Sequence, residues 1–248
     1  MMKMRSVLLL SAGLLCAVTQ TLAAPDGGEL LKKSDTARGG GIPGVFWRVA
    51  LRAVDGDKTE DQGLTVKTDG DNSLAEFFSP PNIADQKFLM AGRNMWFIRT
   101  GLRQPVPISP RQRLLGQASN GDIAATNYAV DYQAKLVAEE AVDGEPCYRL
   151  ELIARNTQVT YPRIDYWVSV ARGLAVQADF FSFSGKVLKS ARFEYENEIE
   201  FQGKKIPFVS RMVIQDRINL GQKTTLQYSA VQARQFPRRT FDLNFLVH

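Results

Sequence analysis

Histidine is almost absent from this chain of 248 residues, and cysteine is rare. The single histidine, His248, is the last residue, which argues against a Ser-His-Asp triad and against a histidine-ligated metal site. The sequence also lacks a nucleophile elbow, a glycine-rich phosphate loop followed by lysine, and a spaced pair of cysteines. We therefore expect no metal, no cofactor and no enzymatic activity.

Long hydrophobic runs are missing except near the N-terminus. The run at residues 7–18 follows Lys3 and Arg5 and precedes small residues at 21–24, a pattern typical of a secretory signal peptide. This run is too short to cross a bilayer comfortably. We expect cleavage after Ala23, which leaves one mature domain at residues 24–248, exported to the periplasm.

Removal of the signal peptide changes the cysteine content and the net charge of the mature chain. Cys147 would be its only cysteine, so no intramolecular disulfide can form, and a strand-like setting indicates a structural thiol. Removal of Lys3 and Arg5 leaves 29 basic residues against 26 acidic ones, a net charge of +3. This charge indicates no particular partner, and export argues against nucleic acid.

Alternation of apolar and polar residues dominates the rest of the chain. Tyr148, Leu150 and Leu152 would share one strand face while Arg149 and Glu151 share the other. Turn signals at the spacing of an antiparallel meander predict roughly ten strands, which favours a large, strongly curved sheet or open barrel. The turn signals lie at residues 55–57, 69–71, 143–144, 184–185 and 202–203.

Two segments depart from this alternation. Residues 29–38 predict a short amphipathic helix that ends at the glycine-rich residues 39–44. Residues 105–110 contain too many prolines for a central strand, and residues 111–117 resemble a short helix. We interpret residues 105–117 as a loop and a helix laid across the sheet.

Adjacent aromatic residues occur at 46–47, 77–78, 96–97 and 180–181. Neighbours on a strand point to opposite faces, so both faces of the sheet require apolar cover from a helix or from a ligand. Core packing is the simpler interpretation for any one of these residues. As ligand-lining residues we select Phe78, Trp96, Phe97, Trp167 and Phe180.

Residues 86–121 contain six basic residues and no acidic one. Such a patch can contact anionic lipid head groups or an acidic partner, although a solvated loop explains it equally well. We place Arg103, Arg111 and Arg113 near the mouth of the predicted cavity, with Leu114 and Leu115 on its lid.

Several carboxylate side chains suggest a hydrolase as an alternative to a binding protein. Glu139, Glu140, Asp165 and Asp179 are candidates for glycoside hydrolysis, which needs a pair of carboxyl groups. The glutamates at 194, 196, 198 and 200 share one strand face and are more typical of a solvated surface. Neutralising Glu139, Asp165 and Asp179 would abolish activity in a hydrolase and leave a binding protein nearly unaffected.

One set of motifs lies in order along the chain. Its central residues are 94–98 (NMWFI), Arg103, 107–109 (PIS), Arg111, Arg113 and 116–123 (GQASNGDI). The flanking residues are 29–31, Asp35, Arg38, 76–80, 136–148, 166–168, 184–186, 206–207 and 211–212. Together these motifs resemble the LolA-like family of outer membrane lipoprotein-sorting proteins, in an extended branch, and the resemblance covers nearly all of the mature chain.

The resemblance implies an incomplete, strongly curved antiparallel β-barrel with a short helical lid and an apolar interior for acyl chains. It implies a monomeric periplasmic carrier of lipid or acylated lipoprotein, with an inner-membrane donor, an outer-membrane receiver and transient membrane contact. The alternatives are an accessory protein of an inner-membrane lipid transporter, a carboxylate-based envelope hydrolase and a structural envelope protein.

Overall fold

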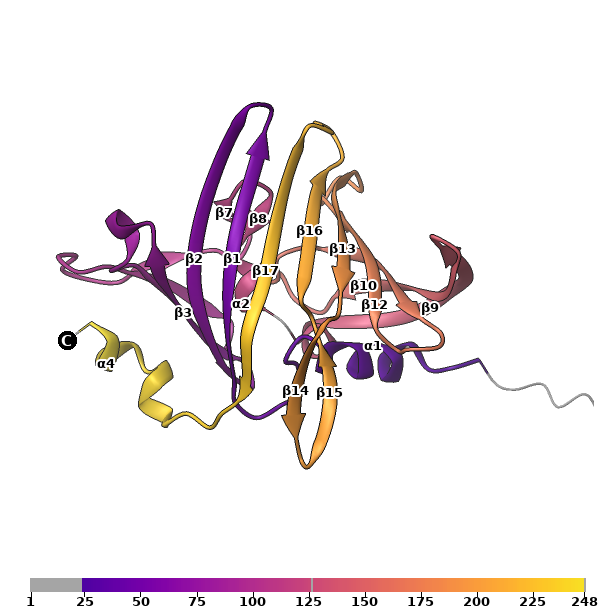
Figure 1. Ribbon diagram of the computed structural model, residues 1–248, viewed down its shortest axis with the longest axis horizontal. Helices are drawn as coiled ribbons and strands as arrows, with labels where there is room; N and C mark the ends of the chain where they lie inside the picture. Colours follow the sequence, from indigo (N-terminus) through magenta and orange to yellow (C-terminus); the bar gives the residue numbers. More distant parts are fainter. Residues whose placement is uncertain (1–23, 126, 248) are drawn as a thin grey trace, which may run out of the picture.

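The fold is built on one antiparallel sheet of 13 strands, in the order β6-β5-β4-β3-β2-β1-β17-β16-β13-β12-β11-β10-β9 (Figure 1). The computed structural model describes residues 24–125 and 127–247, so the predicted signal peptide and His248 lie outside the described residues. The strands of this sheet are β1 (Val45–Asp55), β2 (Lys58–Asp69), β3 (Asn72–Ser79), β4 (Lys87–Ala91), β5 (Asn94–Ile98), β6 (Val106–Ile108), β9 (Tyr132–Val142), β10 (Glu145–Ala154), β11 (Arg163–Ser169), β12 (Ala175–Phe181), β13 (Val187–Glu194), β16 (Arg211–Asp216) and β17 (Gln222–Ala233).

Smaller elements complete the described residues. Two hairpins stand apart from the main sheet, and four short α-helices and two 3-10 helices connect or cover the strands. They are β7 (Arg113–Leu115), β8 (Ala118–Ser119), β14 (Asn197–Phe201), β15 (Lys204–Phe208), α1 (Gly27–Thr36), α2 (Asn120–Ala124), α3 (Tyr128–Asp131), α4 (Leu243–Leu246), η1 (Pro81–Ile83) and η2 (Arg238–Phe241).

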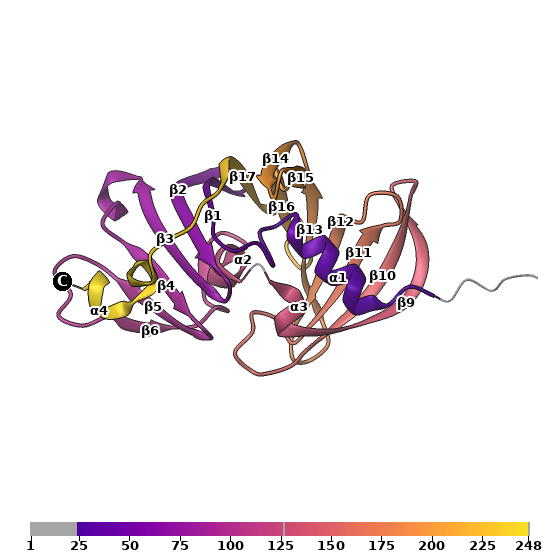
Figure 2. The same ribbon diagram turned by 90° about the horizontal axis from the view of Figure 1, so that it is seen from below.

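The main sheet is strongly curved and not closed. Seen from below, its flanks β3–β6 and β9–β12 lie on either side of α2 and α3, and α1 runs beneath β10–β13 (Figure 2). The edge strands are β6 and β9. The predicted open, curved antiparallel fold is confirmed, although the described residues contain 17 strands where turn signals predicted about ten.

Alternation along the strands builds the core on the concave face. In β1, Trp47, Val49 and Leu51 are buried, whereas the intervening Arg48 and Ala50 are exposed. The register pairs Val49 with Leu64 on β2 and Tyr228 on β17, so the buried positions of neighbouring strands adjoin. One continuous apolar layer therefore lines the inside of the curve.

The convex face has its own apolar cover at one flank. Leu74, Leu89 and Ile98 form a second buried cluster with Phe241, and Trp96 packs against it. The cover is the C-terminal segment that includes η2 and α4, which runs along β3 and β4 (Figure 2). The C-terminal segment thus gives this flank of the sheet apolar cover on its convex face, where no ligand is needed to cover it.

The predicted helix at residues 29–38 is confirmed as α1. It begins after Asp26, whose carboxylate accepts a hydrogen bond from the Glu29 N–H at 2.9 Å, as an N-cap residue does. The predicted helix at residues 111–117 is wrong, because this stretch forms β7 and the turn that leads to β8. Gly116 has a φ of 51°, which suits a turn and not a helix, and α2 begins only at Asn120.

The proline-rich residues 105–110 contain the edge strand β6. An edge position tolerates Pro107, because a residue without an N–H does not interrupt a ladder that has no neighbour on one side. The prediction that this stretch cannot be a central strand is therefore confirmed.

Helix α1 is attached to the concave face through buried polar groups. The Asp35 carboxylate accepts a hydrogen bond from the Ala129 N–H at 2.6 Å, and the Arg38 guanidinium lies 4.4 Å from the Tyr128 ring centre. Burial raises the pKa of the Asp35 carboxyl to about 7, although the positive charge of Arg38 lowers it. The helix is therefore held by an acid that is neutral in mildly acidic solution.

We predict that Asp35 makes the stability of the protein pH-dependent. Its folded pKa of about 7 exceeds the unfolded value, so between about pH 4 and pH 7 the folded state retains a proton that the unfolded state releases. The free energy of unfolding should fall across this window as pH rises, by up to about 4 kcal/mol. Asp35→Asn should remove this component in urea titrations at several pH values. Parallel curves for the two proteins would contradict the prediction.

Candidate functional site

Residues 113–124 lie inside the curve of the sheet, and we call them the plug. The plug comprises β7, the turn at Gly116, β8 and α2 (Figures 1 and 2). Leu115, Ala118 and Ile123 are buried in the main core. The chain thus fills part of its concave face with its own apolar side chains.

The tip of the plug is fitted closely against β1 and β17. A Cβ atom on Gly116 would lie 2.4 Å from the Thr224 hydroxyl oxygen and 2.6 Å from the Ala53 Cβ, so only glycine fits. The Gln117 backbone N–H donates to the Thr224 hydroxyl at 2.7 Å, and its side-chain amide donates to Gln222 at 2.8 Å. These contacts fix the tip at the centre of the sheet.

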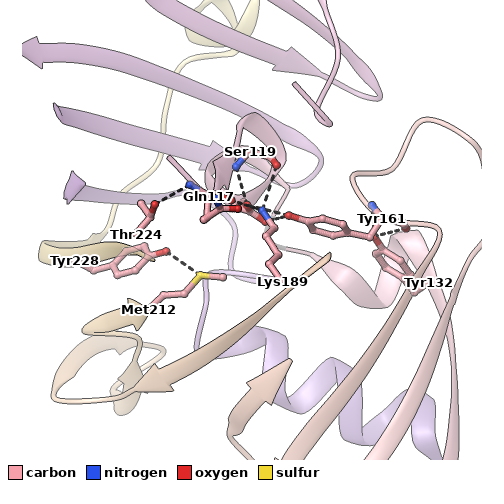
Figure 3. A network of polar contacts seen from close by, with 9 residues as sticks. Gln117, Ser119, Tyr132, Tyr161, Lys189, Met212, Thr224 and Tyr228 are labelled. Carbon is pink, nitrogen blue, oxygen red and sulfur yellow. Dashed lines mark hydrogen bonds and ion pairs between the residues drawn. The ribbon is translucent and has the colours of Figure 1, made fainter. Parts of the chain in front are cut away.

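A buried ion pair holds the other side of the plug (Figure 3). The Lys189 ammonium on β13 lies 2.9 Å from the Asp122 carboxylate on α2, and their side chains are 6% and 0% exposed. Lys189 also donates to the Gln117 carbonyl and to the Ser119 hydroxyl. Two buried charges are tolerated only when they are paired and well bonded.

Tyr161 completes the bonding of Asp122. Its hydroxyl donates to both carboxylate oxygens, at 2.8 and 3.0 Å, and the Ser119 N–H donates to one of them at 2.8 Å. Burial and the neighbouring Asp122 charge raise the pKa of Tyr161 above its usual value, so the phenol keeps its proton and remains a donor. The pair therefore joins the plug to β13 and to the segment before β11.

The plug separates two pockets. A pocket of about 550 Å³ lies between the plug and the β1–β2 hairpin, and Leu114 and Leu115 line it. A second pocket of about 350 Å³ lies between the plug and the turns that flank β13, and Phe181, Phe183 and Ile218 line it. Both pockets reach Arg113, Gly116 and Gln117, and their volumes are in the range of small-molecule sites.

The structure divides the five predicted lining residues between the two faces of the sheet. Phe180 is fully buried on the concave face, where its ring centre lies 4.3 Å from that of Tyr161. Phe97 is on the same face, since it pairs with Phe88, whose ring is in contact with Phe77 in the core. These two are the predicted lining residues that the fold places on the concave side.

Phe78, Trp96 and Trp167 lie on the convex face. Phe78 covers Gly63 and packs under the Arg48 guanidinium at 4.4 Å. Trp96 packs against the C-terminal segment. Trp167 belongs to a separate cluster with Cys147 and Val176, and its indole N–H donates to a Glu140 carboxylate oxygen. Each has a structural partner in the chain itself.

The three predicted mouth arginines separate into two places. Arg111 and Arg113 border the 350 Å³ pocket. Arg103 lies in the β5–β6 loop, between Leu102 and Gln104, which border a different hollow next to Leu246. The structure therefore brings Arg111, Arg113, Leu114 and Leu115 together at the plug and leaves Arg103 apart.

Sequence reasoning missed Lys189, Asp122 and Tyr161 as a unit. Lys189 shares the inward face of its strand with Ala191 and Phe193. A lysine at an inward position of an alternating strand indicates a buried partner. The partner itself could not be found, because Asp122 and Lys189 are 67 residues apart in the chain.

Replacing Lys189 by methionine should destabilise the protein by about 3–5 kcal/mol, because Asp122 would stay buried without its counter-charge. Arg192→Met on the same strand is the matched control, since Arg192 pairs with Asp143 at the surface and should cost at most about 1 kcal/mol. Chemical denaturation measures both. Equal losses in the two variants would show that the buried pair has no special role.

Within the described residues, no helix is long and apolar enough to cross a membrane, and no group of three or more His, Cys, Asp or Glu residues could hold a metal ion.

Comparisons with known proteins identify the family. A LolA superfamily protein from Nitrosomonas europaea is 31% identical with a TM-score of 0.80, over 90% of this chain and 100% of that one. A Vibrio parahaemolyticus domain assigned as an outer membrane lipoprotein-sorting protein is 16% identical, with a TM-score of 0.75 over 90% and 98% of the two chains. A DUF1329 family protein from Desulfovibrio piger is 21% identical, with a TM-score of 0.73 over 89% and 97%.

The sequence searches give one family match. A family model described as "-like: Uncharacterized protein" matches residues 69–248. None of the curated proteins compared with the chain matches it. The predicted resemblance to the LolA-like family is confirmed, and the chain belongs to the LolA superfamily.

Proposed function

We propose that this protein is a periplasmic carrier that buries lipid, or the acyl chains of lipoproteins, on the concave face of its sheet and passes them toward the outer membrane. The fold of the LolA superfamily supports a lipid-binding or lipoprotein-sorting role of this kind. The proposed carrier is a monomer of one domain, residues 24–248, without cofactor, metal or catalytic group. Its partners are an inner-membrane donor and an outer-membrane receiver, and not nucleic acid.

The observation that carries the proposal is the plug between two pockets. Leu115, Ala118 and Ile123 cover apolar concave surface that an acyl chain could cover instead. Burial of each methylene group contributes roughly 0.8 kcal/mol, so a long chain can offset the loss of these contacts together with the separation of the Lys189–Asp122 pair. Exchange of plug for cargo joins the 550 Å³ and 350 Å³ pockets into one groove.

The residues proposed to contact cargo follow from this geometry. Phe97 and Phe180 contribute to the concave wall, and Leu114 and Leu115 belong to the plug that moves. Arg111 and Arg113 stand at the mouth, where they can bind an anionic head group. Phe78, Trp96 and Trp167 have a structural role in this proposal, because they pack on the convex face, and Arg103 is left out because it lies in the β5–β6 loop.

The carboxylates proposed for hydrolysis lie away from the plug. Asp165 and Asp179 are directly opposite each other on β11 and β12, and Arg163 lies 3.4 Å from Asp165. Burial raises the pKa of Asp165 while Arg163 lowers it. Their neighbours on the strands, Ile164, Tyr166 and Phe180, point into the core, so the two carboxylates face the convex side.

Mature protein purified from the periplasm should contain bound lipid or acylated peptide. Native mass spectrometry followed by lipid extraction measures this occupancy. Acylated peptide would identify lipoprotein as the cargo, and free lipid would favour an accessory role for a lipid transporter. Empty protein that also fails to take up an acylated peptide in vitro would contradict the proposed carrier function.

A reversible crosslink tests whether the plug must move. A Cβ on Gly121 would lie 3.1 Å from the Thr160 Cβ, so Gly121→Cys with Thr160→Cys can form a disulfide after small shifts. The variant is made with Cys147→Ala, which removes the free thiol. We expect the oxidised form to take up an acylated fluorescent probe at least tenfold more slowly than the reduced form. Each single-cysteine variant is the control for the oxidant, and equal uptake by the two forms would rule out an opening plug.

A further inference from the structure

Three strongly exposed apolar side chains lie on two turns beside the 350 Å³ pocket, and two of them, Phe183 and Ile218, line it. Phe183, Ile218 and Leu220 are 71%, 70% and 66% exposed. Phe183 lies in the β12–β13 turn and the other two in the β16–β17 turn. The β16–β17 turn lies beside the start of β13, since the Arg217 N–H donates to the carbonyl of Leu188, the second residue of that strand, at 3.0 Å. We call residues 182–186 and 217–221, together with Arg111 and Arg113, the apex.

The apex lies at one end of the molecule. Figure 1 shows both turns at the upper end, away from the β14–β15 hairpin. Phe183 and Ile218 border the same pocket as Arg111 and Arg113. The pocket therefore opens beside two of the exposed apolar side chains and two arginines.

The charge of the apex is mainly positive. Arg111, Arg113, Lys186 and Arg217 carry cations beside the exposed apolar residues, and no ion pair involves them within residues 24–125 and 127–247. The Arg111 guanidinium lies 4.8 Å from the Phe183 ring centre. Arg111 also donates to the Thr157 carbonyl, which holds its charge beside Phe183, and all four cations are exposed to solvent.

The acidic residues near the apex are Asp216 and those of the adjacent β1–β2 hairpin. The Asp216 carboxylate accepts hydrogen bonds from the Ile218 and Asn219 N–H groups, at 2.6 and 2.8 Å. In the hairpin, Asp55 accepts a hydrogen bond from Gln222 at 3.1 Å and Asp61 pairs with Arg52 at 2.8 Å. Asp57 and Glu60 make no ion pair within the described residues. Asp216 is therefore engaged in forming the turn that presents Ile218 and Leu220.

We propose that the apex docks the protein on the anionic surface of a membrane, with Phe183, Ile218 and Leu220 inserted at the level of the lipid head groups. Apolar side chains flanked by arginine and lysine are the chemistry of interfacial binding. Each cation near an anionic bilayer adds to the attraction, and screening by salt weakens it. This inference deepens the proposed carrier function, because a docked apex brings the pocket mouth against the lipid.

Sedimentation with vesicles tests the docking surface. The full mature protein, emptied of lipid, is mixed with two kinds of phosphatidylcholine vesicle. One kind contains no phosphatidylglycerol, and the other contains roughly 40% of this anionic lipid, which gives the surface a negative charge. We expect binding to the anionic vesicles, weakened at least tenfold by Phe183→Ser with Ile218→Ser and Leu220→Ser. Arg111→Gln with Arg113→Gln should weaken binding and reduce its dependence on salt.

Two control variants lie away from the apex. Phe245→Ser removes a side chain that is equally exposed, at 66%, in the C-terminal α4. Lys204→Gln with Lys205→Gln removes two cations from the β14–β15 hairpin. Neither should change vesicle binding. Loss of binding in these controls as large as in the apex variants would overturn the assignment of the surface.

Failure of the docking proposal is distinguishable from failure of the carrier function. Uptake of an acylated probe from solution with no vesicle binding overturns the docking surface and leaves the carrier. Vesicle binding without uptake contradicts the carrier and supports the docking surface. Capture of a receiver protein through the apex, without binding to any vesicle, overturns the membrane proposal in favour of a protein partner.

Discussion

The Lys189–Asp122 ion pair is the interaction on which the inside of this protein depends. A curved sheet of 13 strands has a concave face too large for its own side chains to cover, and the plug fills the gap. Apolar contacts are not directional, so they alone would let the plug shift along the sheet. Two charges buried against each other, with Tyr161 and Ser119 completing their bonds, fix one position instead.

The sheet architecture could be predicted from the sequence because it follows from local patterns. Alternation with period two identified the strands, and glycine- and aspartate-containing turns identified the antiparallel connections. The strand count was too low because short strands such as β4, β5 and β6 lack a full alternating run. Residues 111–117 were misread as a helix because a three-residue hairpin strand has no periodicity to distinguish it from one helical turn.

The candidate site could be predicted only in part, because alternation along a strand shows which residues are buried together but not where they lie in the fold. Phe97 and Phe180 fell on the concave face, whereas Phe78, Trp96 and Trp167 fell on the convex one, because parity shows which residues share a face but not which face is concave. Arg103 separated from Arg111 and Arg113 because a β-strand and a loop intervene. The Asp122–Lys189 pair joins segments that only the folded sheet brings together.

The covalent attachment of the plug has a consequence for how a carrier would perform at different concentrations. Residues 113–124 are tethered at both ends, to β6 on one side and to α3 and β9 on the other. A tethered segment competes at a fixed effective concentration, typically millimolar, that dilution does not change. The competition between plug and cargo is therefore set by the chain itself. The protein would therefore release cargo equally readily at high and at low protein concentration. A competitor that was not part of the chain would lose its effect on dilution.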